Sequence, residues 1–234
     1  MCGQGVSMKK GYLVLQDGQV FEGLRFGAEH DTVGELVFTT GMCGYIETLT
    51  DPSYAGQIVM QTYPLIGNYG IIRADFEGPC CVKGYVVREY CDMPSNFRTD
   101  CDLDTFLKEQ SVPGLYGVDT RELTRIIRES GVMNGAILTT FDPADPANKA
   151  ETEKLLETIR AYAVTDAVKS VTCEKPEVFH EKGETHIVLM HYGCKRNIVR
   201  CLVKRGCKVT VMPAFATAEE VAALNPDGIM LSNG

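Results

Sequence analysis

The carboxyl-terminal part of the chain, residues 186–234, constrains the fold most strongly, because short apolar runs alternate there with amphipathic segments. Residues 187–190 (Ile-Val-Leu-Met) are wholly apolar, which is typical of a strand covered on both faces. From Lys195 onward, apolar residues recur at helical spacing. Further runs predict a strand at 208–212, a helix at 218–224 and a strand at 228–231. This alternation predicts right-handed crossovers and a parallel sheet.

Parallel sheets of this kind bind their ligands at the carboxyl ends of the strands. Two such ends are visible here, at residues 191–194 and 232–234. Three strands are too few for the usual two-sided α/β layer, so we interpret the segment as the first β-α-β-α-β of a flavodoxin-like domain that is cut short. No phosphate-binding loop is expected at the first strand end, because the dinucleotide fingerprint needs three spaced glycines and only Gly193 is present.

The composition is that of an ordinary globular protein. The 234 residues, of which 44% are hydrophobic and 23% charged, suffice for one or two cores. The formal net charge of −8 argues against nucleic acid and against an anionic membrane surface as partners. No apolar run approaches the roughly 20 residues that cross a bilayer. The basic pair at residues 9–10 precedes an apolar run too short for a signal peptide, so we expect a cytoplasmic protein.

The ten cysteines are predicted to be free thiols, because nothing in the sequence directs the chain to an oxidising compartment. Their spacing matches no usual pattern of zinc ligands, and no metal site is predicted. Met1 and Met8 are alternative starts of the chain. With the second start, residues 1–7 would be an unstructured leader.

The part upstream of residue 141 predicts a β-rich domain. Asp17 and Gly18 form a hairpin turn dipeptide between the apolar runs 12–15 and 20–21. Other extended stretches predict strands at 35–39, 57–63, 82–88, 112–118 and 136–139. The sheet of this domain is therefore expected to dominate its fold.

Two helices interrupt these strands. Asp102 is placed to cap a short helix, and Asp119 with Glu122 resembles a capping box at the start of a longer one. On the longer helix, Arg125 should pair with Glu122 and with Glu129, which lie three and four residues away.

Composition also indicates where the domains meet. Residues 142–148 carry two prolines and two aspartates, and an amphipathic helix at 149–162 and a polar connection at 172–184 follow. The predicted organisation is an N-terminal domain at 9–141, a helical and polar linker at 142–185, and an incomplete second domain at 186–234.

Five segments carry a family resemblance. They are residues 34–70, the SNFR motif at 95–98, and the segments 117–137, 193–214 and 225–234. In this order they resemble the small, glutamine amidotransferase subunit of carbamoyl phosphate synthase. The resemblance extends from residue 12 to residue 234, which makes it more specific than any single motif.

The resemblance implies an α/β fold, with a layered β-rich N-terminal domain followed by the first β-α-β-α-β of a class I amidotransferase domain. It also implies an activity. Family members hydrolyse L-glutamine through a cysteine thioester and pass ammonia to a large subunit, which makes carbamoyl phosphate for arginine and pyrimidine synthesis. ATP and Mg²⁺ then belong to the large subunit, and no cofactor is expected in this chain.

No cysteine is a convincing nucleophile, so we expect no catalytic residue in this chain and no activity from it alone. The family places its nucleophile on a G-x-C-x-G elbow. Residues 41–44 (Gly-Met-Cys-Gly) come close, but Tyr45 stands where the second glycine is needed, and Cys43 replaces a usual threonine. Cys194 lies at a strand-to-helix turn, where a helix N-terminus can lower a thiol pKa. Because the family has an apolar residue there, we predict a small, partly buried side chain.

His191 ends a predicted strand, where an acid–base group would be well placed. The family usually has an aspartate at this position. We therefore favour a structural role for His191, with an acid–base role as the alternative.

The resemblance places glutamine against two turns, at residues 39–45 and 232–234. Gly41 and Gly234 are the candidate substrate-binding residues, through backbone contacts only, because Gly41 stands where some members carry serine. Small-molecule sites favour domain interfaces, so both glycines are expected to face one shared cleft. The simpler alternative is that each glycine only permits a tight turn.

A rival function is that of a non-enzymatic domain that docks on the large subunit, to which spare basic residues such as Arg121 and Arg128 would contribute. A third possibility is a stand-alone flavodoxin-like binding protein for an unrelated ligand. A downstream G-x-C-x-G-x-Q motif and a later His-x-Glu would distinguish the enzyme from both.

Overall fold

A computed structural model describes residues 9–234. The two alternative starts, Met1 and Met8, and the leader predicted at residues 1–7 all lie outside the described residues. The described part forms two compact units. The first contains residues up to 48 together with 56–75 and 82–164, and the second contains 49–55, 76–81 and 165–234. The second unit thus includes two segments from early in the chain, whereas each domain predicted from the sequence covers one continuous range of residues.

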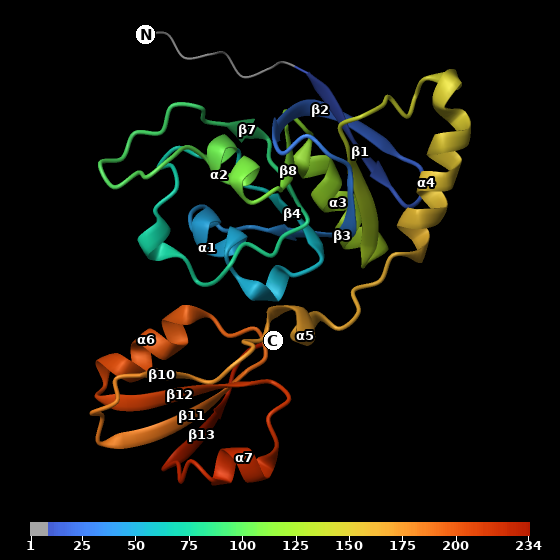
Figure 1. Cartoon of the computed structure of the whole chain (residues 1–234). Coiled ribbons are helices and arrows are strands. Elements are labelled where there is room, and N and C mark those ends of the chain that lie inside the picture. Colours follow the sequence, from blue (N-terminus) through green and yellow to red (C-terminus); the bar gives the residue numbers. More distant parts are fainter. Residues whose placement is uncertain (1–8) are drawn as a thin grey trace. The chain divides into compact units, whose positions relative to one another are not determined.

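The first unit is built on a closed barrel of seven strands (Figure 1). Around the barrel the strands are β1 (Lys10–Leu15), β2 (Val20–Gly27), β8 (Pro113–Tyr116), β6 (Gly84–Val86), β4 (Gln57–Gln61), β3 (Thr32–Thr39) and β9 (Met133–Leu138). The predicted hairpin is confirmed, since β1 and β2 pair antiparallel. Its turn holds Gly18 at a φ of 93°, which favours glycine. Closure of the sheet into a barrel was not specified by the sequence pattern.

Two helices cover the barrel in different ways. The helix α3 (Thr120–Ser130) packs Leu123 and Ile127 against the barrel interior, together with residues such as Leu13, Leu36, Ile58 and Leu115. The helix α4 (Lys149–Ala161) packs Ile159 against Tyr12 and Val14 on the outer side of β1. Successive residues of β1 therefore face the two different cores, as the period-two geometry of a strand requires.

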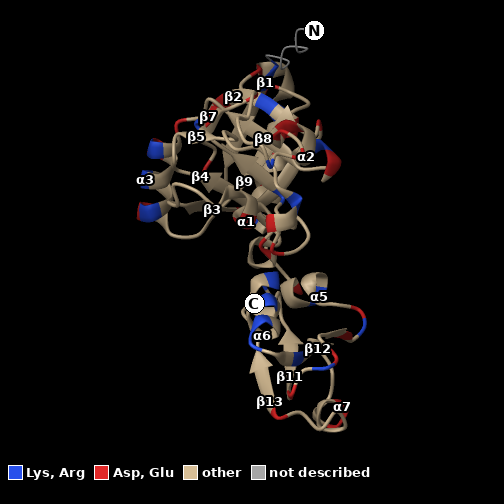
Figure 2. Ribbon diagram, turned by 90° about the vertical axis from the view of Figure 1, so that its left-hand side faces the viewer, with Lys and Arg blue, Asp and Glu red and all other residues tan. Residues whose placement is uncertain are grey.

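The N-caps and ion pairs predicted for the helices of this unit are confirmed, although the Glu122 carboxylate pairs with Arg125 instead of completing a capping box. Asp102 accepts a hydrogen bond from Thr105 N (2.9 Å) and begins α2 (Leu103–Glu109). At the start of α3, Asp119 accepts from Glu122 N (3.1 Å). Arg125 contacts Glu122 at 2.6 Å and Glu129 at 3.9 Å. Figure 2 shows the arginines of α3 as blue bands along one side of this unit.

The shorter elements of the first unit connect the barrel strands. They are α1 (Tyr45–Leu49), β5 (Leu65–Ile66), β7 (Glu89–Tyr90) and the 3₁₀ turns η2 (Arg73–Asp75) and η3 (Pro146–Asn148). The strands β5 and β7 pair with each other in a separate parallel ribbon.

The second unit contains a four-stranded sheet in the order β10-β12-β11-β13. Its strands are β10 (Glu177–Phe179), β11 (Thr185–His191), β12 (Cys207–Pro213) and β13 (Gly228–Leu231). As predicted, β11, β12 and β13 are parallel. The polar connection predicted at 172–184 is wrong in part, because β10 lies within it and pairs antiparallel with β12. Phe179 of β10 packs on the apolar cluster below α6, which fixes this short strand.

Helices cover both faces of this sheet, so its three parallel strands support a two-sided layer after all. The helix α6 (Arg196–Lys204) packs Val199 against Leu189 and Val209. The helix α7 (Ala218–Ala222) packs Val221 against Val188 and Met190 on the other face (Figure 1). A short helix, α5 (Ala167–Val171), and a 3₁₀ turn, η1 (Pro52–Tyr54), complete the unit.

In the part of the chain that the structure describes, no helix is both long enough and apolar enough to cross a membrane.

The exposed edge of the second sheet generates a first prediction. The strand β13 pairs with β11 alone and exposes 60% of Ile229 and 66% of Leu231. We expect its amides to exchange hydrogen at least about tenfold faster than those of β1, because edge strands open locally at low cost. Hydrogen exchange measured by mass spectrometry at two protein concentrations checks this. Equal protection of β13 and β1 at both concentrations would contradict it.

Candidate functional site

The loop 39–45 of the first unit is held at both ends. The Thr39 carbonyl accepts hydrogen bonds from Thr62 N and Thr62 Oγ1, each at 3.0 Å. At the other end, the Tyr69 hydroxyl accepts from Gly44 N (2.9 Å) and Tyr45 N (3.2 Å). The rings of Tyr45 and Tyr69 stack with centroids 4.2 Å apart. The loop therefore has a fixed geometry although its middle faces solvent.

Gly41 and Cys43 lie in that exposed middle. The Gly41 N–H donates a long hydrogen bond to Thr39 Oγ1 (3.4 Å). A Cβ atom added at Gly41 would lie 3.1 Å from the Cys43 carbonyl oxygen. A side chain at this position would need the loop to shift by a few tenths of an ångström. As a glycine, residue 41 can offer backbone groups to a ligand but no side chain.

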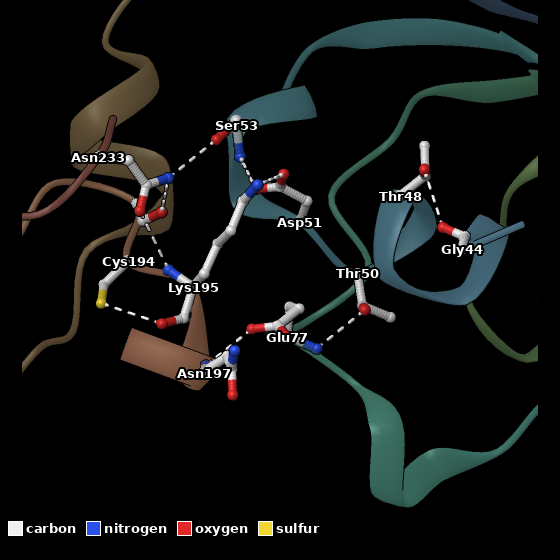
Figure 3. Close-up of polar contacts among 11 residues, drawn as sticks. Gly44, Thr48, Thr50, Asp51, Ser53, Glu77, Cys194, Lys195, Asn197 and Asn233 are labelled. Carbon is white, nitrogen blue, oxygen red and sulfur yellow. Dashed lines mark hydrogen bonds and ion pairs between the residues drawn. The ribbon is translucent and has the colours of Figure 1, made fainter. Parts of the chain in front are cut away.

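The turn 232–234 of the second unit ties two neighbouring strand ends together (Figure 3). Tyr192 N donates to Ser232 Oγ at 3.0 Å. The Asn233 amide accepts from Lys195 N (3.3 Å) and donates to the Gly193 carbonyl (3.1 Å). The carboxyl ends of β11 and β13 thus form one continuous polar surface, which is where parallel sheets bind ligands.

Gly193 and Gly234 lie against each other at this surface. Gly193 has a φ of 119°, and a Cβ atom built on it would lie 3.6 Å from Gly234 Cα. A Cβ atom at Gly234 would lie 3.1 Å from the Tyr192 carbonyl oxygen. The positive φ favours glycine at position 193, and the close approach of the Tyr192 carbonyl favours glycine at position 234.

A segment from early in the chain braces this turn. Asp51, whose side chain is only 9% exposed, pairs with Lys195 Nζ at 2.9 Å, and this contact raises the pKa of the Lys195 ammonium. Asp51 also accepts a hydrogen bond from Ser53 N at 3.0 Å. Ser53 Oγ in turn accepts from Asn233 Nδ2 at 3.1 Å. The same 51–53 segment therefore holds both strand ends.

A second early segment caps α6. The Glu77 carbonyl accepts from Arg196 N (2.8 Å), and its carboxylate accepts from Asn197 N (2.8 Å). Lys195, at the N-cap position of α6, provides no side-chain cap. The Glu77 carboxylate therefore supplies it and complements the positive end of the helix dipole. Glu77 N also donates to Thr50 Oγ1 (3.0 Å), which fixes the segment itself.

Sequence reasoning missed Asp51, Ser53, Glu77 and Asn233 as bracing residues. One signal was available, because the first turn of α6 begins Lys-Arg-Asn and offers no usual capping side chain. Such a helix start predicts a cap from elsewhere in the chain. Nothing in the sequence says where that cap comes from.

Cys194 is a buried structural residue, as predicted. Its side chain packs with Leu189 and Val199, and it is only 5% exposed. Burial, and then the nearby charge of Glu77, raises the pKa of its thiol to about 11. The helix N-terminus therefore does not activate this thiol, and the alternative of a reactive Cys194 finds no support.

His191 is half-buried at the end of β11, and its Nδ1 accepts a long hydrogen bond from Gly193 N (3.4 Å). This contact favours the structural role. Within residues 9–234, no group of three or more metal-binding side chains comes together. The nine described cysteines are all free thiols.

Gly41 belongs to the first compact unit and Gly234 to the second. A shared cleft that brings both against one glutamine stays a prediction.

Comparison with known proteins identifies two families along the chain. Residues 13–137 match the model of the carbamoyl-phosphate synthase small chain, CPSase domain, and residues 187–234 match that of the class-I glutamine amidotransferases. The chain is also similar to curated proteins named carbamoyl phosphate synthase small chain. Identity is 49% over 97% of this chain for Listeria monocytogenes and 50% over 96% for Bacillus anthracis.

A further relative, from Halalkalibacterium halodurans, is named as the pyrimidine-specific small chain and is 46% identical over 96% of this chain. In all three comparisons the chain spans about 60% of the relative's own length (61%, 60% and 60%).

The raised pKa of Cys194 predicts slow thiol chemistry. At pH 8, a thiol with a pKa of about 11 is ionised in only about one molecule in a thousand, and the thiolate is the reactive form. We expect iodoacetamide to label the exposed Cys43 at least about 100-fold faster than Cys194 in the folded protein. Peptide mass spectrometry over a time course measures both rates. Labelling of Cys194 as fast as Cys43 would show that Cys194 is an activated thiol.

The cap from Glu77 predicts a loss of stability on its removal. The substitution Glu77→Ala should destabilise the second unit by about 1 kcal/mol, because it leaves Asn197 N without its acceptor at the helix start. Urea unfolding with a probe in the second unit measures this. The matched control is Glu174→Ala, at an exposed residue of the same unit, which should change stability by less than about 0.5 kcal/mol. Equal effects of the two substitutions would refute the cap.

Proposed function

Because this chain belongs to the family of carbamoyl-phosphate synthase small chains, we propose that it acts as part of the glutamine-hydrolysing subunit of that enzyme. It carries the N-terminal domain and the first part of the amidotransferase domain. The observation that carries the proposal is the order of the two family matches, 13–137 and 187–234, within one chain of 234 residues. A stand-alone flavodoxin-like protein would match the second family without the first.

In the proposed reaction, the intact subunit releases ammonia from L-glutamine. A large subunit uses the ammonia to make carbamoyl phosphate in the cytoplasm, for arginine and pyrimidine synthesis. The proposal assigns ATP and Mg²⁺ to the large subunit and no cofactor to this chain. The name of the Halalkalibacterium halodurans relative favours the pyrimidine branch.

The proposed glutamine contacts are the backbone groups of Gly41 and Gly234. The rigid loop around Gly41, anchored through Tyr69, and the braced turn at Gly234 support this assignment. Both present backbone rather than side chains, and pre-formed backbone donors orient a small polar ligand at little cost in conformational entropy. The braces from Asp51 and Glu77 would keep the second turn in place before glutamine arrives.

The chemistry itself needs a nucleophile that these residues do not supply. The chain of 234 residues contains no G-x-C-x-G elbow, and its buried Cys194 has a raised pKa. We therefore propose that this chain binds the large subunit but does not hydrolyse glutamine alone. The alternative is a domain that only docks on the large subunit. It also predicts binding without glutamine hydrolysis for this chain. The two hypotheses differ only in whether glutamine is hydrolysed once the remaining part of the family's amidotransferase domain is supplied.

The test combines binding and turnover. In a calorimetric titration, the chain should bind the purified large subunit of carbamoyl phosphate synthase from Listeria innocua. The rate of glutamate release from glutamine should not exceed that of a blank without protein. The small chain of Listeria innocua, 48% identical to this chain, is the positive control for both assays. Absence of binding while the control binds would overturn the proposed function. Glutamate release that survives purification would overturn the predicted inactivity, and Cys194→Ser would then locate the nucleophile.

A further inference from the structure

We propose that Asn233 is a site of spontaneous deamidation, a reaction with water that converts its side-chain amide into a carboxylate and loosens the turn 232–234. The chemistry does not depend on the proposed function. Its consequence bears on that function, because the turn carries Gly234, one of the proposed glutamine contacts.

The chain contains two Asn-Gly dipeptides, at residues 134–135 and 233–234. This dipeptide deamidates more readily than other asparagine-containing pairs. A glycine leaves its own backbone nitrogen unshielded, and it lets the chain adopt the conformation needed for attack on the asparagine side chain. The sequence alone therefore predicts equal susceptibility for both asparagines. Their surroundings in the structure differ.

Deamidation is a ring closure followed by hydrolysis. The Gly234 nitrogen attacks Asn233 Cγ, so that a C–N bond forms and the Cγ–Nδ2 bond breaks. Ammonia leaves and carries the proton that the Gly234 nitrogen gives up. Water then opens the succinimide ring at one of its two carbonyl groups. The product is aspartate or isoaspartate at position 233, and the only co-reactant is water.

The barrel protects Asn134 from this reaction. Gly135, which would supply the attacking nitrogen, lies inside β9, a strand that pairs with β1 on one side and with β3 on the other. An extended backbone in a ladder holds that nitrogen away from the preceding side chain. The Asn134 amide also donates to the carbonyls of Ile159 (3.0 Å) and Tyr162 (2.8 Å). Ring closure at Asn134 therefore requires the barrel to open, which is among the most costly of local openings.

The nitrogen beside Asn233 is held much less. Gly234 follows the end of β13 and is exposed. Its N–H donates to no acceptor within residues 9–234. Asn233 itself is half-buried, so water can reach the ring once it has formed. Ring closure here needs only a local rearrangement of the turn, and not the opening of a sheet.

A backbone donor assists the attack at Asn233. Its Oδ1 accepts from Lys195 N at 3.3 Å (Figure 3), and this oxygen gains negative charge when a nitrogen adds to Cγ. A donor already directed at the oxygen stabilises that charge, as backbone N–H groups do in an oxyanion hole.

Two other bonds act in the opposite direction, because they hold the Asn233 amide in place. Nδ2 donates to the Gly193 carbonyl and to Ser53 Oγ, each at 3.1 Å. Both acceptors lie in turns, which open at lower cost than the strands of a closed barrel. These bonds therefore slow the reaction at Asn233 less than the barrel slows it at Asn134.

The product cannot restore the bonds of the turn. A carboxylate only accepts hydrogen bonds, so the Gly193 carbonyl loses its donor and the Ser53 hydroxyl has to turn round to donate instead. The new negative charge also lies near Asp51, because Ser53 N donates to Asp51 while Ser53 Oγ contacts residue 233. Two neighbouring carboxylates repel each other. Deamidation therefore loosens the strand ends that Asn233 joins.

The first test compares the two asparagines in the same protein. The folded chain is kept in a mildly alkaline buffer at physiological temperature, and samples taken over several weeks are digested and analysed by liquid chromatography and mass spectrometry. We expect Asn233 to deamidate at least about tenfold faster than Asn134, because it needs only local opening. In guanidinium chloride the two rates should agree within about threefold, since neither dipeptide is then protected.

Two results would overturn the proposal. One is deamidation of Asn134 as fast as that of Asn233 in the folded chain. The other is an Asn233 that stays intact during the time in which the unfolded chain reacts completely. In water enriched in heavy oxygen, the label should enter the product at position 233, and a product without label would exclude hydrolysis of a succinimide.

The second test measures the effect on the turn with Asn233→Asp, which reproduces one product. We expect the amides of residues 192–195 to exchange hydrogen at least about tenfold faster than in the unmodified chain. The matched control is Asn225→Asp, at an exposed residue of the same unit, which adds the same charge and should change this exchange less than about twofold. Unchanged exchange in β1 confirms that each variant is folded.

Equal exchange of residues 192–195 in the unmodified chain, the variant and the control would overturn the loosening of the turn. Neither test uses the large subunit or glutamine. A failure of this inference is therefore distinguishable from a failure of the proposed function, which is measured by binding to the large subunit.

Discussion

The cap that Glu77 places on α6 is the contact that joins an early segment of the chain to the second unit. The helix starts with a lysine at its N-cap position and has no capping side chain of its own, so its first amide groups need acceptors from outside. Glu77, 120 residues away in the chain, supplies both its carbonyl and its carboxylate. Because Asp51 holds Lys195 at the same turn, two short early segments belong physically to a unit formed mainly by the last third of the chain.

This arrangement gives the strand ends of the second sheet a rigid frame. The Asn233 amide links Gly193, Lys195 and Ser53, and the turn that carries Gly234 is fixed by those bonds. In the first unit the corresponding rigidity comes from an aromatic anchor, in which Tyr69 holds both amide groups of residues 44 and 45. Both candidate ligand turns are therefore pre-organised by side-chain hydrogen bonds, an arrangement that generally lowers the entropy cost of binding.

The helix α3 of the first unit has one face that packs into the core and an opposite face that carries charged side chains. Leu123 and Ile127 close the barrel core, and this packing fixes the direction of the opposite side of the helix. The arginines on that side are then held in a defined stripe, because their backbone is part of the core structure. An exposed charge pair contributes little to stability, about 0–1 kcal/mol, so the pairs of Arg125 with Glu122 and Glu129 add little to the fold.

Local patterns in the sequence determined most of the secondary structure of this protein. Asp102 and Asp119 predicted helix starts because a capping carboxylate acts over three residues, and the apolar run 187–190 predicted a buried parallel strand because covered strands need no polar face. Order and spacing of the motifs also predicted the family. The tertiary structure alone decided the closure of the barrel, the pairing of β10, and the braces from Asp51 and Glu77. These contacts join residues far apart in the chain, and a periodicity read over one helix or strand carries no information about which distant residue supplies a missing hydrogen-bond partner.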